Sequence, residues 1–261
     1  MNLRPNKLKK LLQDGGIAYG TCMCAYSPNL VELAGLLGYN FCRIDNEHAW
    51  RQDEMIEHMI RAAIIADIVP LVRVDKGNPA MIRKVLEIGA AGFIIPNIKN
   101  AEEVKAIVQA AKFPPMGERG FSGLCFSGGY GTIPADQWKN WSDQETMVGI
   151  MIENEQAVKN INEIMAVTGL DFVMFGPADY SISIGLSKPD KESPRVQEAI
   201  KLTAETAQAN GKSMILPIGE PWAEEAQKYS KLGINMIEIG HDYSMLNRAW
   251  QKALASVKAT D

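Results

Sequence analysis

Two acidic residues each follow a short apolar segment of the chain. Glu153 comes after residues 147–152, and Asp179 comes just past the Gly-Pro break that ends residues 171–175. If the two segments are neighbouring parallel strands, the carboxylates lie about 5–10 Å apart, because strands are spaced about 4.8 Å apart. Two such charges repel, so one must take up a proton or a cation must lie between them. Oxygen ligands with open positions suit Mg²⁺ or Mn²⁺, and the alternative is that one acid caps a helix.

Arg73 lies near the end of another apolar segment, residues 68–74, with the sequence IVPLVRV. An arginine is costly to bury unless it faces an anion. Its planar guanidinium fits a substrate carboxylate or a polarised keto oxygen in a bidentate fashion. A structural ion pair with a nearby acid is the alternative.

Asp45 and His48 follow a third apolar segment with two residues between them. A carboxylate that holds an imidazole in one tautomer makes it a better general base. We therefore expect Asp45 to orient His48. We expect Glu47, which lies between them, to point elsewhere and to be an outer partner of a metal site. The spacing alone is weak evidence, because it also occurs where the histidine has no role.

Other kinds of catalytic group are missing from the sequence. There is no Gly-x-Ser-x-Gly motif for a serine nucleophile. Lys99 and Lys212 flank expected strands, but neither stands where a Schiff base could form. The cysteines contain no Cys-x-x-Cys pair and are expected to be reduced thiols in the core or lining the barrel. They are Cys22, Cys24, Cys42 and Cys125. Metal-stabilised enolate chemistry is the natural interpretation that is left.

The bulk properties of the 261-residue chain exclude several kinds of partner. The formal net charge is −4, and no basic excess indicates binding to nucleic acid or to a membrane surface. The N-terminal residues have no apolar core of a signal peptide, and no apolar run is long enough to span a bilayer. We therefore expect a cytoplasmic protein.

The elements that must position these residues alternate between strands and helices. The expected strands are residues 17–25, 40–45, 69–74, 92–98, 147–153, 171–175, 213–217 and 236–240. The expected helices are residues 1–14, 28–37, 52–66, 79–88, 101–111, 155–167, 194–209, 221–232 and 243–257. Residues 113–145 are expected to form one long loop, because glycine and proline recur in them.

This alternation implies a parallel sheet covered by helices. Eight strand–helix units in a chain of this length match a (β/α)₈ TIM barrel, so we expect residues 1–261 to form a single domain of that fold. An open doubly wound sheet is the alternative, but the first strand lacks the glycine-rich fingerprint that it would normally carry. In a barrel, the candidate residues all lie at the carboxyl ends of strands, where active sites form.

Motifs at these strand ends resemble the HpcH/HpaI aldolase family, the class II metal-dependent pyruvate aldolases of the 4-hydroxy-2-oxoheptanedioate aldolase type. The motifs keep their order over about residues 17–250 and read IDNEH, VRV, GAAGFIIPNIKNAEEV, FPPMGERG, MIENEQAVKNINEI and GLDFVMFGPADYSISIG. The resemblance implies an enzyme that reversibly cleaves a 4-hydroxy-2-oxo acid to an aldehyde and pyruvate, or a close analogue, through a metal-bound enolate.

The resemblance also implies roles for single residues. Glu153 and Asp179 would bind the divalent cation, with Co²⁺ and Zn²⁺ as further candidates beside Mg²⁺ and Mn²⁺. Arg73 would hold the pyruvate group and stabilise the enolate. His48, backed by Asp45, would be the acid/base, and Glu47 an outer partner of a metal-bound water. The implied substrate contacts are Arg73, Gly176, Pro177, Ala178, Asp179 and Leu216.

The resemblance extends to assembly. Family members are typically hexamers, trimers of dimers that exchange their last helix, so residues 243–257 are candidates for swapping. Glu87 stands where the family often has an aspartate that reaches the active site of a neighbouring subunit.

The sequence departs from the family pattern around the substrate pocket. Met151 replaces a glutamine two residues before Glu153, and His241 replaces a small residue. Trp50 stands where the second motif usually ends in proline, and residues 121–131 lack an arginine of the family. We therefore expect enolate chemistry to be kept, with Met151 and His241 as specificity candidates. An oxaloacetate decarboxylase or a macrophomate-synthase-like enzyme on the same scaffold stays open, as does a non-catalytic barrel that binds an oxo acid.

Overall fold

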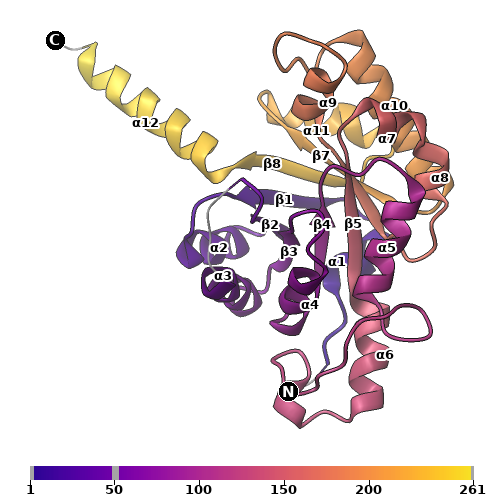
Figure 1. Ribbon diagram of the computed structural model, residues 1–261. Helices are drawn as coiled ribbons and strands as arrows, with labels where there is room; N and C mark the ends of the chain where they lie inside the picture. The colour runs from indigo at the N-terminus through magenta and orange to yellow at the C-terminus, as the bar shows by residue number, and fades with distance from the viewer. Residues whose placement is uncertain (1–2, 49–52, 260–261) are drawn as a thin grey trace.

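Eight parallel strands form a closed barrel in the computed structural model, which describes residues 3–48 and 53–259 (Figure 1). Each strand pairs with the next along the chain, and the last pairs back onto the first. The strands are β1 (Ala18–Met23), β2 (Phe41–Asp45), β3 (Val69–Arg73), β4 (Gly92–Ile95), β5 (Met147–Ile152), β6 (Phe172–Phe175), β7 (Ser213–Ile218) and β8 (Met236–His241). The predicted TIM barrel is confirmed.

Helices surround the barrel and connect its strands (Figure 1). They are α1 (Lys7–Gln13), α2 (Pro28–Leu36), α3 (Asp53–Ile65), α4 (Pro79–Glu87), α5 (Ala101–Ala111), η1 (Gly129–Gly131), α6 (Ala135–Glu145), α7 (Glu155–Lys159), α8 (Ile161–Met165), α9 (Pro177–Ser183), α10 (Pro194–Ala209), α11 (Trp222–Ser230) and α12 (Asp242–Lys258). The last helix, α12, stands away from the barrel, and of its residues only Asp242 is buried.

The hydrophobic core has two layers, because each strand is buried on both faces. Alternate side chains along β7 show the division: Ile215 packs inside the barrel, whereas Met214 and Leu216 pack against the surrounding helices. The ring of Phe172 fills the barrel interior beside Gly149, where a Cβ atom would come within 2.2 Å of the ring. Only glycine can occupy that position without displacing the ring.

Helix α1 covers the amino-terminal end of the barrel. Asn6 starts the helix, because its side chain accepts hydrogen bonds from the backbone N–H groups of Leu8 and Lys9. Leu8 then packs into the inner layer of the core. The opposite, carboxyl-terminal end of the barrel carries the candidate active-site residues.

Three segments differ from the sequence-based expectation. The end of the expected loop 113–145 forms helix α6, whose Trp138 is fully buried against Phe113, with ring centroids 5.3 Å apart. The glycines and prolines that suggested a loop end at Pro134, and the segment after it has no helix breaker. The expected helix 155–167 is divided into α7 and α8. Helix α9 begins at Pro177, directly after β6, because proline is favoured in the first turn of a helix.

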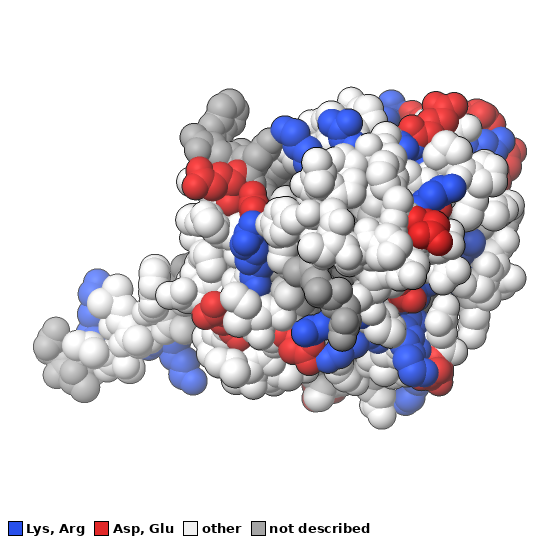
Figure 2. Space-filling view, turned by 90° about the horizontal axis from the view of Figure 1, so that it is seen from below, with Lys and Arg blue, Asp and Glu red and all other residues white. Residues whose placement is uncertain are grey.

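The surface carries charges of both signs. Figure 2 shows one face of the molecule, on which Lys and Arg side chains are interspersed with Asp and Glu side chains. None of the described helices is both long and apolar enough to cross a bilayer.

Candidate active site

Asp45 and Arg73 form a buried ion pair at the carboxyl ends of β2 and β3. The two residues are register partners, each the last residue of its strand. Arg73 donates from Nε to Asp45 Oδ1 at 3.0 Å and from Nη2 to Asp45 Oδ2 at 2.5 Å. This bidentate pairing fixes the plane of the guanidinium group at the mouth of the barrel.

Asp45 also holds the loop that follows β2. Its Oδ1 accepts hydrogen bonds from the backbone N–H groups of Glu47 at 3.0 Å and His48 at 3.4 Å. Burial raises the pKa of Asp45, but the hydrogen bonds and charge of Arg73 outweigh burial and hold this pKa below its ordinary value. Asp45 therefore stays ionised throughout the neutral range.

The acid beside the imidazole of His48 is Glu47, whose Oε2 lies 3.7 Å from Nε2. Asp45 accepts a hydrogen bond from the backbone N–H of His48, and both of its carboxylate oxygens bind Arg73. Glu47 does not point elsewhere, as the sequence suggested, because its Oε2 also lies 2.9 Å from Nη1 of Arg73. The expected Asp45–imidazole pair is thus replaced by a chain of contacts from Arg73 through Glu47 to His48. The imidazole itself is largely exposed and can exchange protons at the mouth.

Glu153 is a buried carboxylate directly after β5. Its Oε1 accepts a hydrogen bond of 2.6 Å from the backbone N–H of Asn97, which follows β4. Asn97 has φ of 58°, in the left-handed region that asparagine tolerates better than most residues. Burial, together with the charges of Asp179 and Glu47, raises the pKa of Glu153 to about 7 against the opposing effects of the Asn97 N–H and Arg73. Glu153 therefore shares this end of the barrel with Asp45, Glu47 and Asp179, and Arg73 pairs with Asp45 and Glu47.

Gly176 leaves room for this carboxylate at the end of β6. A Cβ atom on Gly176 would lie 2.8 Å from Cβ and 2.9 Å from Oε2 of Glu153. Asp179 lies three residues later, in the first turn of α9. The N-cap of that helix is Gly176, so Asp179 is not the N-cap.

The carboxylates fit a divalent cation of the kind that the family resemblance implies. Glu153 and Asp179 offer oxygen ligands, which Mg²⁺ and Mn²⁺ prefer. The buried Glu153 has an Oε2 beside a residue without a side chain, and its pKa is raised first by burial and then by repulsion from Asp179 and Glu47, both of which a bound cation would offset. Among the described residues, the groups of three that could hold an ion lie elsewhere at the mouth and include neither Glu153 nor Asp179.

Three further candidates have different surroundings. Met151 lies inside the barrel two residues before Glu153, and its Sδ accepts a hydrogen bond from Nη1 of Arg73 at 3.8 Å. Leu216 does not line the site with its side chain, which is fully buried between β7 and the surrounding helices. Glu87 ends α4, which leads into the amino-terminal end of β4, so it lies away from the mouth of its own barrel.

His241 ends β8 and is the N-cap of α12, and Asp242 is the first residue of that helix. Nδ1 of His241 accepts a hydrogen bond of 3.2 Å from the backbone N–H of Ser244, so the imidazole caps the helix. The carboxylate of Asp242 accepts from the backbone N–H groups of Cys24 at 3.0 Å and Ala25 at 2.7 Å.

The sequence reasoning did not connect Cys24 with this side of the mouth. The expected closure of an eight-strand barrel could have predicted this contact, because closure makes β1, which precedes Cys24, a neighbour of β8. Trp50, another departure from the family pattern, lies outside the described residues.

Comparisons with known proteins agree on one family. The model of the HpcH/HpaI aldolase/citrate lyase family matches residues 20–249. The 5-keto-4-deoxy-D-glucarate aldolase of Enterobacter sp. (strain 638) is 31% identical over 255 residues, 97% of each chain. An HpcH/HpaI aldolase from Desulfitobacterium hafniense DCB-2 superimposes with a TM-score of 0.90, 30% identity and 96% coverage of each chain. Citrate synthase SbnG superimposes with a TM-score of 0.89, 31% identity and 98% coverage of each chain. The chain therefore belongs to the HpcH/HpaI aldolase/citrate lyase family.

Proposed function

We propose that the protein is a divalent-metal-dependent aldolase that reversibly cleaves a 4-hydroxy-2-oxo acid to pyruvate, or a close analogue, and an aldehyde. The observation that carries the proposal is that the charges of Glu47, Glu153 and Asp179 act on one another at the carboxyl end of the barrel, where Arg73 binds Glu47. Such a site can bind a cation and an anionic oxygen side by side. The aldolases among the relatives support the same reaction class.

Glu153 and Asp179 are the residues that would hold the metal, and the bound ion would supply positive charge that stabilises an enolate. Mg²⁺ and Mn²⁺ suit the oxygen ligands best. Arg73 binds the keto oxygen of the pyruvate group and stabilises the negative charge that develops on it. Asp45 keeps the guanidinium in position through its two hydrogen bonds.

The substrate carboxylate binds at the start of α9. Pro177 has no N–H group, and the N–H groups of Ala178 and Asp179 lie in the first turn, where the helix itself offers no acceptor. Gly176 allows the substrate and Glu153 to approach the same stretch of backbone. We propose this turn as the place for the pyruvate carboxylate.

His48 and Glu47 move the proton of the reaction. In cleavage, the C4 hydroxyl gives up its proton as the C3–C4 bond breaks, and the electron pair of that bond passes into the enolate, which becomes pyruvate when C3 takes up a proton. The exposed imidazole of His48 takes this proton, and Glu47 beside it stabilises the imidazolium. In the synthetic direction, the same imidazole returns the proton to the aldehyde oxygen.

The decisive experiment compares pyruvate release from several 4-hydroxy-2-oxo acids with and without EDTA. We expect EDTA to abolish the release and added Mg²⁺ or Mn²⁺ to restore it. Full activity in excess EDTA would refute the metal dependence. Failure of every such substrate in the presence of metal would refute the aldolase activity.

A reaction on oxaloacetate is the second candidate. The likeness to citrate synthase SbnG, equal in identity to that with the 5-keto-4-deoxy-D-glucarate aldolase of Enterobacter sp. (strain 638), favours it. Loss of CO₂ from oxaloacetate leaves the same pyruvate enolate, so Arg73 would have the same role. Oxaloacetate consumption that exceeds the rate of aldol cleavage at saturating metal would favour a decarboxylase or a carbon–carbon bond-forming enzyme.

The projecting helix α12 supports assembly with further copies of the chain. Trp250, Leu254 and Val257 expose apolar side chains along it. We propose that α12 packs on a neighbouring subunit in a hexamer built as a trimer of dimers, and that Glu87 approaches the site of another subunit. A monomeric mass in light scattering would refute this assembly. Location in the cytoplasm stays a prediction.

A further inference from the structure

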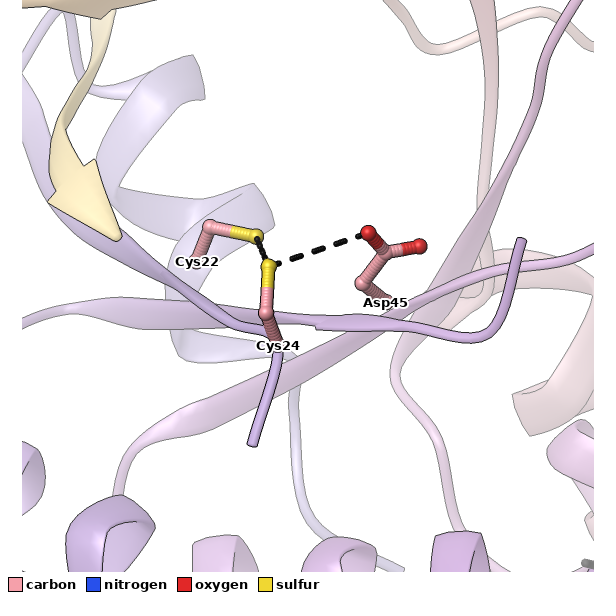
Figure 3. Close-up of side chains that lie close together, drawn as sticks. All are labelled: Cys22, Cys24 and Asp45. Carbon is pink, nitrogen blue, oxygen red and sulfur yellow. Dashed lines mark hydrogen bonds between the residues drawn. The ribbon is translucent and has the colours of Figure 1, made fainter. Parts of the chain in front are cut away.

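A second cluster of potential metal ligands lies at the mouth of the barrel, next to the candidate active site. Cys22 belongs to β1, Cys24 follows that strand, and Asp45 ends β2. Figure 3 shows the two sulfur atoms facing each other, with the carboxylate of Asp45 pointing toward them. The Sγ atoms are 3.5 Å apart, and Cys24 Sγ lies 3.8 Å from Asp45 Oδ2. One donor atom from each residue lies within 4.8 Å of the others.

These separations match the edges of a metal coordination tetrahedron. Two thiolates bound to Zn²⁺ at about 2.3 Å lie about 3.8 Å apart, and a thiolate and a carboxylate oxygen lie about 3.5 Å apart. The sulfur atoms lie 3.5 Å apart and Cys24 Sγ lies 3.8 Å from Asp45 Oδ2, so each separation is within about 0.3 Å of the corresponding edge. A disulfide would need the sulfur atoms at about 2.05 Å. The two sulfur atoms are therefore spaced to bind one metal ion.

A fourth ligand is available from the neighbouring strand β8. Cys22 is the register partner of His241 across the β1–β8 pair. Cys24, His241 and Asp242 form a second set whose donor atoms also lie within 4.8 Å of one another. Asp242 holds the backbone of Cys24 through the hydrogen bond from its N–H group. Cys24 therefore belongs to both sets of donor atoms, and the hydrogen bond to Asp242 fixes its backbone between them.

The surroundings act in opposite directions on the two thiols: they lower the pKa of Cys24 and raise that of Cys22 well above its ordinary value. The hydrogen bond between the two sulfur atoms lowers the pKa of Cys24 and raises that of Cys22. Arg43 lies beside Cys22 on β2, and its charge lowers the pKa of both thiols. Nε and Nη2 of Arg43 bind Glu238, whereas its buried Nη1 has no hydrogen-bond partner among the described residues. A thiolate at Cys22 would place negative charge near this unpaired donor.

We propose that Cys22, Cys24 and Asp45 form a binding site for a thiophilic divalent cation such as Zn²⁺, with a fourth ligand from the His241–Asp242 side. Binding releases the two thiol protons to solvent and leaves the sulfur oxidation state unchanged. The site is distinct from the carboxylate pair Glu153 and Asp179, whose hard oxygen ligands suit Mg²⁺ and Mn²⁺.

A Cd²⁺ titration tests the proposal, because thiolate ligands give Cd²⁺ a charge-transfer absorption in the ultraviolet that oxygen ligands lack. The full-length protein is stripped with EDTA, kept reduced by a phosphine and saturated with Mg²⁺ before the titration. We expect a saturable absorption at one Cd²⁺ per chain, which added Zn²⁺ removes. Absence of this absorption in the wild-type protein would overturn the proposal.

Variants assign the absorption to these residues. Cys24→Ser, at a half-buried position where the substitution is small, should lose the absorption. Cys125→Ser is the matched control, since Cys125 is the other half-buried free thiol and lies outside the cluster, and should keep it. Glu153→Gln should also keep it. Cys22→Ser provides a second loss variant.

An undiminished absorption in Cys24→Ser would refute the assignment. Pyruvate release by Cys24→Ser with Mg²⁺ is measured separately. The metal site and the proposed aldolase activity can therefore fail independently.

Discussion

The two sides of the barrel mouth present opposite kinds of chemistry. The side formed by β2, β3, β5 and β6 holds Arg73 together with four carboxylates: Asp45 and Glu153 are buried, Glu47 is half-buried and Asp179 is exposed. The side formed by β1 and β8 holds two thiols, an imidazole and an acid whose oxygens bind backbone N–H groups. Asp45 belongs to both, since it pairs with Arg73 and lies beside Cys24.

The difference shows how the fold separates two kinds of ligand within one mouth. On the carboxylate side, acids outnumber the positive charges, so the like charges repel one another until a cation binds or one acid takes up a proton. On the thiol side, the ligands can shed protons when a soft ion binds. Variants on each side should therefore affect different measurements.

Arg73→Ala should have the largest effect on the carboxylate side. It removes the group that stabilises the enolate, and we expect kcat for aldol cleavage to fall about 10²–10³-fold, the usual cost of losing one such donor. Steady-state kinetics with saturating Mg²⁺ measure the loss. Arg73→Lys is the control, because it keeps the charge without the bidentate geometry and should lose activity as well. Wild-type turnover in Arg73→Ala would contradict the role, and Cd²⁺ absorption should persist in both variants.

Glu153→Gln should have the next largest effect, on stability and its pH dependence. The pKa of Glu153 is raised from 4.5 to about 7 in the folded protein, so the folded state binds more protons than the unfolded state between these values. Stability of the metal-free protein therefore falls as the pH rises through this window. At about pH 8 in EDTA, the glutamine variant should be more stable by at most about 3.5 kcal/mol, at about 1.4 kcal/mol for each pKa unit.

Urea unfolding in EDTA at about pH 8 and about pH 4 measures this difference, which should vanish at the lower pH, where both states are protonated. Added Mg²⁺ should stabilise the wild-type protein and not the variant. Glu163→Gln, at an exposed position on α8, is the matched control and should change neither result. A glutamine variant less stable than the wild type at about pH 8 in EDTA would show that the carboxylate is already compensated.

The two sides also differ in how far the sequence could predict them. The barrel follows from local patterns, because each apolar segment and each helix is recognisable within a few turns of chain. That pattern placed Arg73 at the end of β3, Glu153 directly after β5 and Asp179 past the Gly-Pro break that follows β6, as the structure has them. It could not predict that Arg73 occupies both oxygens of Asp45, because that depends on side-chain geometry between strands.

The thiol side was harder to predict, because its parts are far apart in the chain. The hydrogen bond between Cys24 and Asp242 joins residues separated by 218 positions. Only closure of the barrel brings them together. Leu216 shows the other limit: the period-two alternation of β7 decides which way a side chain faces, and it turns Leu216 toward the helices.

Met151→Gln tests the carboxylate side of the mouth, because Met151 contacts Arg73 from inside the barrel. The weak N–H···S contact from Arg73 would become a stronger N–H···O bond to the glutamine. We expect the relative kcat/KM for small and large aldehydes to change by up to about tenfold, a shift equal to about 1.4 kcal/mol. Met151→Leu, which keeps the volume without the acceptor, is the control. Unchanged selectivity in the glutamine variant would show that Met151 does not determine substrate specificity.

His241→Ala should have the smallest effect, and it tests the other side of the mouth. The imidazole caps α12 through the N–H of Ser244, so its loss should destabilise that helix by about 1 kcal/mol, as for other N-caps. His241→Asn keeps a capping acceptor and should restore the stability. If His241 also lines the pocket, both variants should shift aldehyde preference to a similar extent, whereas only the alanine variant lowers stability. A preference that changes only when the cap is lost would mean that His241 acts by positioning α12, and that the carboxylate side alone selects the substrate.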